Sequence, residues 1–186
     1  RIKCANNLKQ IGVALHNHEG ALGVFPQGRN GYPKVVSAPA RLLAYMEQDS
    51  LQRLIDPDGT LAVGGQNDLA GKNRVVTFIC PSDAGNGQVP GSAYYGTNYV
   101  ANNGTGMIAD AAGNYVSSLK IPDGNGPFAQ NPCRVADITD GLSNTAAFSE
   151  SLLGKGIAPS GTPTDVRYFV LEVAGGNDTT PSDCTG

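Results

Sequence analysis

The sequence has few charged residues, only two histidines, no long apolar run and no closely spaced pair of cysteines. Charged residues make up 16% of its 186 residues, and the formal net charge is −3. This balance gives no basic footprint for nucleic acid or an anionic membrane, so we expect neither as a partner. No window approaches the ~18 consecutive apolar residues that cross a bilayer. With His16 and His18 as the only histidines, hydrolytic triads are poorly supplied, and we expect no enzyme.

The four cysteines are far apart, which makes a zinc ribbon or a thioredoxin-like site a poor interpretation. They are Cys4, Cys80, Cys133 and Cys184. An even number of dispersed cysteines, in a polar chain with 25 glycines and 12 prolines, favours two disulfides in an oxidising, extracytoplasmic compartment. Four cysteines allow three pairings. We predict that Cys4 pairs with Cys80 and Cys133 with Cys184, with four free buried thiols as the alternative.

The apolar residues near the start recur at helical spacing and predict an amphipathic helix that ends near Asn17, with Gly20 as its C-cap. Its buried face is formed by Cys4, Leu8, Ile11, Leu15 and His18. The chain opens on Arg1, without a methionine or a helix-starting cap residue before the pattern. We therefore expect a helix whose upstream half is missing, in a single domain spanning residues 1–186.

The rest of the chain predicts one more helix followed by strands. Leu43, Met46 and Leu51 contribute to a broad apolar face over residues 40–55. Short β-like runs, separated by Gly, Pro and Asn-Gly turns, then predict strands at residues 74–80, 93–101, 145–149 and 166–173. Helices first and strands afterwards, without βαβ alternation, indicate an α+β fold with an antiparallel sheet.

Four sequence pieces in this order resemble the planctomycete family of prepilin-type, solute-binding-like proteins of unknown function. The pieces are Cys4-Ala-Asn-Asn-Leu-Lys-Gln-Ile-Gly with His16-Asn, Phe78-Ile-Cys-Pro-Ser-Asp83, Asn98-Tyr-Val with Asn103-Gly104, and Asp137-Ile-Thr-Asp-Gly-Leu-Ser-Asn-Thr145 with Glu150. Residues 43–48 also look like that family's second-helix motif. The resemblance covers residues 1–153 and implies a pilin-like architecture: a prepilin-type cleavage site, an apolar helix running into the first piece, and that helix packed on the sheet. The family's His-containing ending has no counterpart after Leu153.

This resemblance implies a non-enzymatic, pseudopilin-like structural or surface-display subunit. We expect it outside the cytoplasm, at the cell surface or in the periplasm, anchored or polymerised through the missing helix. Its expected partners are further copies or other pilin-like subunits, which would meet Arg1, Lys3 and Lys9. The alternative is a surface-anchored module that binds glycans or small solutes, and a hydrolase is a weaker third hypothesis.

For the binding alternative, candidate ligand-binding residues are Tyr94, Tyr95, Tyr99 and Asn103, together with the loop at 124–128. Aromatic faces beside amide groups are typical of sugar sites. Tyrosine in a strand also packs into cores, so both interpretations stay open.

Calcium is the best-supported ion from the residues alone, and we expect no other cofactor. Asp123, Asn125, Asp137 and Asp140 stand in two short loop clusters that offer the oxygen ligands calcium prefers. Asx turns explain the same residues without a metal, and neither cluster matches the EF-hand pattern. The two histidines, spaced i, i+2 on a helix, point to different faces and do not chelate one metal.

Overall fold

A computed structural model describes residues 1–28, 36–83, 85–89, 92–104, 126–129 and 131–153. Within these ranges the fold is α+β, as predicted, with helical segments in its first half and a two-stranded sheet later. In chain order the elements are α1 (Ile2–Leu22), α2 (Ala38–Leu42), the 3-10 turn η1 (Leu43–Tyr45), α3 (Asp49–Gln52), α4 (Gln66–Gly71), η2 (Val76–Phe78), β1 (Tyr99–Ala101), η3 (Val135–Asp137) and β2 (Phe148–Glu150).

Helix α1 confirms the expected amphipathic helix, with Ile11 and Leu15 buried and Leu8 packed against the core. It continues five residues beyond the predicted end at Asn17. The C-cap is Gly23 rather than Gly20: Gly23 is left-handed (φ 72°), and its N–H donates to the Glu19 carbonyl at 2.6 Å. A glycine inside a helix costs only about 1 kcal/mol relative to alanine, which the exposed Gly20 position tolerates.

The predicted second helix at 40–55 is wrong as one element, because the chain there folds as α2, η1 and α3. Glu47, a non-glycine residue, takes a positive φ of 58°, which no α-helix accommodates. The apolar pattern was nevertheless informative. Leu42, Leu43 and Leu51 are all at most 8% exposed, so three short turns bury the residues that one helix was expected to bury.

The strand predictions are only partly confirmed. Residues 74–80 contain η2 instead of a strand, and residues 93–101 contribute only β1 and an isolated bridge between Tyr95 and Gln88. The predicted strand at 145–149 overlaps β2, while residues 166–173 lie outside the described part. The β-propensity of β-branched and aromatic residues is a weak preference, and tertiary contacts override it here.

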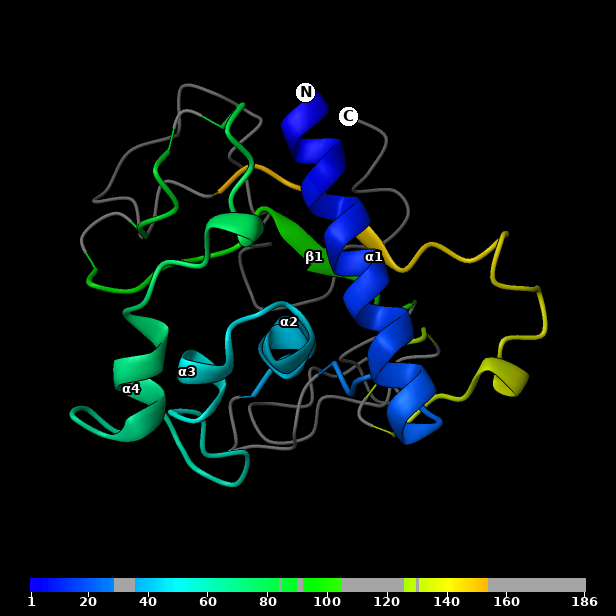
Figure 1. The fold of residues 1–186 in the computed structure, drawn as a ribbon, viewed down its shortest axis with the longest axis horizontal. Coiled ribbons are helices and arrows are strands. Elements are labelled where there is room, and N and C mark those ends of the chain that lie inside the picture. The colour runs from blue at the N-terminus through cyan, green and yellow to red at the C-terminus, as the bar shows by residue number, and fades with distance from the viewer. Residues whose placement is uncertain (29–35, 84, 90–91, 105–125, 130, 154–186) are drawn as a thin grey trace, which may run out of the picture.

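Strands β1 and β2 pair antiparallel, with Tyr99 opposite Glu150 and Ala101 opposite Phe148. Helix α1 meets this sheet through β1, in keeping with the predicted α+β fold. Its main contacts are with α2, η1 and η2, and Tyr99 supplies a buried link from β1. Figure 1 shows α2 and α3 between α1 and α4.

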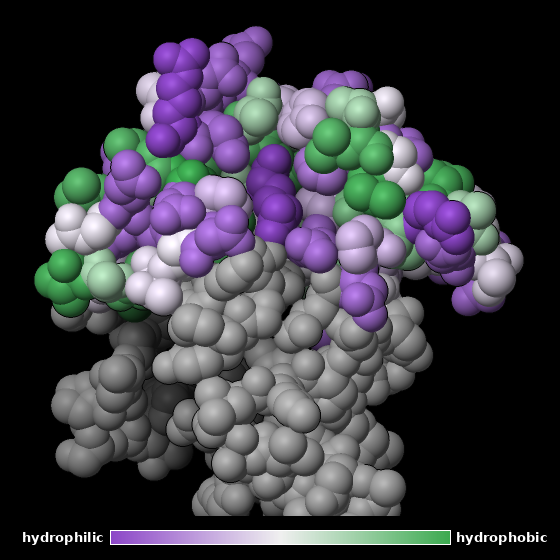
Figure 2. Space-filling view, turned by 90° about the horizontal axis from the view of Figure 1, so that it is seen from below, coloured by the Kyte–Doolittle hydropathy of each residue, from purple (hydrophilic) through white to green (hydrophobic). Residues whose placement is uncertain are grey.

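One apolar core joins these elements. It contains residues from α1, α2, η1, α3, η2 and β1, and Phe128 reaches it from the segment before η3. None of the helices in the described ranges combines the length and the apolar character needed to cross a bilayer. Seen from below, the described residues show hydrophobic side chains in small groups among hydrophilic ones (Figure 2).

Candidate functional site

Three of the four pieces that carry the family resemblance meet in space at a disulfide. Cys4 of α1 and Cys80, just after η2, are bonded across 76 residues of sequence, with their Cα atoms 4.9 Å apart. Both cysteines are at least 92% buried. The predicted Cys4–Cys80 pairing is therefore confirmed, and it fixes the first turn of α1 against the segment that follows η2.

Asn98, only 1% exposed, connects the second piece with the third. Its side-chain oxygen accepts from the Cys80 N–H at 2.8 Å, and its side-chain amide donates to the Asp83 carboxylate at 2.6 Å and to the Ser151 carbonyl at 2.9 Å. Its backbone N–H donates to the Phe78 carbonyl at 2.9 Å. Buried polar groups are costly unless paired, so this side chain specifies how three segments meet.

Three further bonds extend the same junction. The Tyr99 hydroxyl donates to the Cys4 carbonyl at 3.2 Å, and burial raises the pKa of that hydroxyl. Asp83 accepts a second bond, from the Leu153 N–H at 2.8 Å. The Asn7 amide donates to the Ile79 carbonyl at 3.0 Å. We call this set, centred on the disulfide and Asn98, the disulfide junction.

A groove of about 440 Å³ lies beside the disulfide junction and is lined partly by Asp83, Asn98 and Glu150. Among the described residues, a metal-type cluster is formed by Cys4, Cys80 and Glu150. Because both sulfurs are consumed by the disulfide, they are not thiolate ligands. The polar groups of the disulfide junction bond to other segments of the chain, so their role in the fold is structural.

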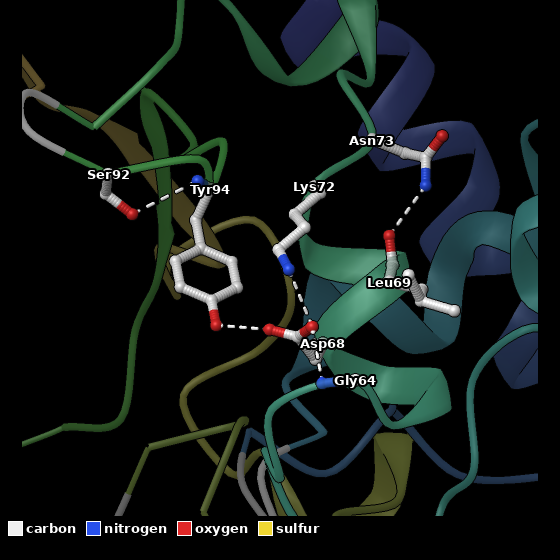
Figure 3. Close-up of polar contacts among 7 residues, drawn as sticks. All are labelled: Gly64, Asp68, Leu69, Lys72, Asn73, Ser92 and Tyr94. Atoms are coloured by element: carbon white, nitrogen blue, oxygen red, sulfur yellow. Dashed lines mark hydrogen bonds and ion pairs between the residues drawn. The ribbon is translucent and has the colours of Figure 1, made fainter.

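A second polar cluster holds α4 against the segment before β1. Asp68 is fully buried and pairs with Lys72 at 2.7 Å, accepts from the Gly64 N–H at 3.0 Å, and accepts from the Tyr94 hydroxyl (Figure 3). These bonds, the Lys72 bond first, lower the pKa of Asp68 to about 2. The Asp68 bond in turn raises the pKa of Tyr94. Sequence analysis missed this cluster, although the i, i+4 spacing of Asp68 and Lys72 is a recognisable signal.

A cavity of about 320 Å³ lies between α2, α3, α4 and η2. Its wall includes buried apolar side chains, among them Leu43, Leu51, Val75 and Phe78. Tyr95 also lines it and is positioned by a bond from its N–H to the Gly71 carbonyl at 3.0 Å. Cavities of this size and character are typical of small-molecule sites. We call it the α2–α4 cavity.

The four candidate ligand-binding residues do not form one surface. Tyr99 is 0% exposed, so its ring has no face open to a ligand, and the Tyr94 hydroxyl is engaged by Asp68. Tyr95 lines the α2–α4 cavity. Asn103 packs with the expected 124–128 loop: its carbonyl accepts from the Gly126 N–H at 3.0 Å. A Cβ at Gly126 would lie 2.4 Å from the Asn103 carbonyl carbon, so only glycine permits this approach.

The described part of the chain does not bring the four proposed calcium ligands together in one site. Asp123 and Asn125 lie outside the described residues. The Asp137 carboxylate is engaged by Arg134, with 2.9 Å between Nη2 and Oδ1, and these bonds lower the pKa of Asp137. Asp140 is exposed, and its carbonyl accepts from the Asn144 amide at 2.8 Å. The Asp137 carboxylate is thus held by Arg134, a contact different from the Asx turn that the sequence suggested.

The remaining candidates have local roles. His18 is buried, and its Nδ1 donates to the Val24 carbonyl at 3.0 Å, while burial lowers its pKa. His16 is exposed on another face of α1. Cys133 is half-buried and bonded to no cysteine of the described ranges; its predicted partner, Cys184, lies outside them.

Comparison with known proteins places the chain at the level of a family. No curated protein and no solved structure matches it. The model of one family, described as a protein of unknown function (DUF1559), matches residues 1–183. That match spans nearly the whole chain, the disulfide junction included. The chain therefore belongs to the DUF1559 family.

Proposed function

We propose that this chain is the globular part of a non-enzymatic, extracytoplasmic subunit of pseudopilin type, which serves as a structural or surface-display unit. The observation that carries the proposal is the disulfide junction. The segments that carry the family resemblance use their polar groups to hold one another, through Asn98, Asp83 and the Cys4 carbonyl. A buried disulfide is typical of proteins from oxidising compartments, which supports a location outside the cytoplasm.

The position of α1 supports attachment through its N-terminal end. Ile2 is 80% exposed, and the first turn of α1 lies at an outer end of the molecule (Figure 1). An apolar helix preceding Arg1 would continue α1 outward without displacing the core. That helix would bury itself in lipid or among identical helices, and the globular part would face outward.

The test compares the full-length protein, with the natural sequence upstream of Arg1, with the chain of 186 residues alone. Cell fractionation, surface protease digestion and negative-stain microscopy would be applied to both. We expect the full-length protein at the membrane or in filaments, accessible from outside, and the shorter chain dispersed. Full-length protein in the cytoplasm with reduced Cys4 and Cys80 would contradict the proposal.

A second candidate, a module that binds small solutes, is favoured by the α2–α4 cavity. Its volume of about 320 Å³ is in the range of known ligand pockets. Among the tyrosines expected in a glycan site, Tyr95 lines it. Display at a surface and solute binding are compatible roles for one subunit. A thermal-shift screen of neutral and charged small molecules tests this candidate, and the absence of any saturable stabilisation would count against it.

A further inference from the structure

We propose that the α2–α4 cavity binds a neutral, mainly apolar small molecule of about ten to twelve carbon atoms with one hydrogen-bonding end. This inference rests on the second candidate function and names its class of ligand. Three properties of the cavity carry it: its volume, the lack of charge on its walls, and the small number of polar groups that its walls leave for a ligand.

The volume sets the size of the ligand. An apolar cavity of about 150 Å³ in another protein holds one benzene molecule. The α2–α4 cavity, at about 320 Å³, is roughly twice as large and matches a fused bicyclic ring or a medium-length alkyl chain. A sugar ring of similar size needs many hydrogen-bond partners, which a wall formed by Leu43, Val75 and Phe78 does not supply.

The lining sets the charge of the ligand. Among the described residues that line the cavity, none carries a charged side chain. A carboxylate, phosphate or ammonium group moved into such a site loses its hydration without gaining an opposite charge, which is strongly unfavourable. The ligand is therefore uncharged at neutral pH.

Two of the polar side chains that line the cavity, Asn67 and Thr97, are engaged by the fold. Asn67 bonds the backbone N–H and the carbonyl of Asp56, at 2.9 and 3.0 Å. The Thr97 hydroxyl lies 3.3 Å from the Phe78 carbonyl and 3.0 Å from the Tyr99 N–H. The Asn67 and Thr97 side chains therefore form part of the wall and offer a ligand few free hydrogen-bonding groups.

Ser37 and Tyr95 line the cavity with hydroxyl groups, and Asn73, which is exposed, lines it with a side-chain amide. Its amide donates to the Leu69 carbonyl at 2.8 Å, and this bond orients the side chain so that its amide oxygen is left to accept (Figure 3). An asparagine oxygen has two acceptor sites. A hydroxyl or amide N–H on the ligand would donate to it, while the apolar body lies against Leu43 and Phe78.

The test uses two probes that share one ring system and differ in charge, 2-naphthol and 2-naphthalenesulfonate. Isothermal titration calorimetry with the full chain should give saturable one-to-one binding of 2-naphthol. The sulfonate should bind about tenfold more weakly or worse, because its charge enters an uncharged site. Equal binding of the two probes would overturn the neutral-ligand inference.

Two matched variants locate the site. Ala40 lines the cavity and is half-buried, whereas Ala44, four residues later, is exposed and does not line it. Ala40→Leu should weaken 2-naphthol binding about tenfold by filling the cavity, and Ala44→Leu should leave it unchanged. Leu61→Ala, at a lining residue that is 47% exposed, should weaken binding about threefold without disturbing the fold.

The outcomes separate this inference from the function on which it rests. Sulfonate binding that Ala40→Leu abolishes would keep the solute-binding module and overturn the neutral ligand. Binding of 2-naphthol that neither Ala40→Leu nor Leu61→Ala weakens would place it elsewhere and overturn the site. If neither probe binds and no solute stabilises the chain in the thermal-shift screen, the inference and the solute-binding function both fail.

Discussion

Loss of the Cys4–Cys80 disulfide should remove a large part of the free energy of unfolding. The bond closes a loop of 76 residues. In the chain-entropy description, closing such a loop lowers the entropy of the unfolded chain by about 15 cal/mol/K, or about 4.5 kcal/mol at 25 °C. Domains are stable by about 5–15 kcal/mol in total. The variant Cys4→Ala/Cys80→Ala should therefore be close to the limit of folding at 37 °C.

Urea unfolding followed by circular dichroism measures this loss. With a slope of about 2 kcal/mol per molar urea, the midpoint should fall by about 2 M. Cys4→Ala and Cys80→Ala alone should each lose as much as the double variant, because each removes the same bond. The double variant treated with a reductant is the control, since any further loss reports a disulfide elsewhere, such as Cys133–Cys184.

A loss below about 1 kcal/mol in the double variant would refute this reasoning. So would single-variant losses that add up to that of the double variant, because additivity would mean that the two cysteines act independently.

Four further predictions follow from individual residues. Asn98→Ala removes a hydrogen-bond partner from the buried Cys80 N–H and from the Asp83 carboxylate. It should therefore lower the free energy of unfolding in urea by about 3 kcal/mol or more, and a loss under 1 kcal/mol would contradict this role of Asn98. The stability given by ionised Asp68 should be present above pH 3.8 and lost as the pH falls to about 2. The urea midpoint should therefore drop more steeply over that pH range in the wild type than in Asp68→Asn, and equal slopes would count against this prediction. An NMR titration of His18 should give a pKa below the usual value of 6.5, and a pKa at or above 6.5 would disagree with its burial. The stability that neutral His18 contributes should be present above pH 6.5 and lost as the pH falls toward the folded-state pKa. Glu47→Val should lower the free energy of unfolding in urea by about 1 kcal/mol, because a β-branched residue resists positive φ. Glu47→Gly should not lower it, and equal stability of the two variants would be inconsistent with the positive φ at this position.

The sequence predicted well those features that depend on local pattern and covalent chemistry. The apolar period of α1 identified Ile11 and Leu15 as buried, a strong signal because a long amphipathic stretch has few other ways to bury its face. The dispersed cysteines predicted disulfides, and the Cys4–Cys80 pair was chosen from three possible pairings that the sequence does not distinguish.

Features that depend on tertiary contacts were predicted less well. The β-branched run at residues 74–80 is a good strand by composition, yet Phe78 and Cys80 bond to Asn98 rather than to a neighbouring strand. The break at Glu47 was hidden because the apolar residues around it continue a helical period. The α2–α4 cavity was not predicted, since its walls come from segments far apart in the sequence.

Peptide mapping without reduction tests the central claim most directly, namely that the Cys4 and Cys80 segments, which both carry the family resemblance, are joined by a disulfide. Trypsin places the four cysteines on separate peptides: residues 4–9, 75–120, 121–134 and 168–186. We predict a linked species of residues 4–9 with 75–120 that separates on reduction. Linkage of residues 4–9 to either of the other two peptides, or a free Cys4 thiol in protein alkylated before digestion, would contradict the account.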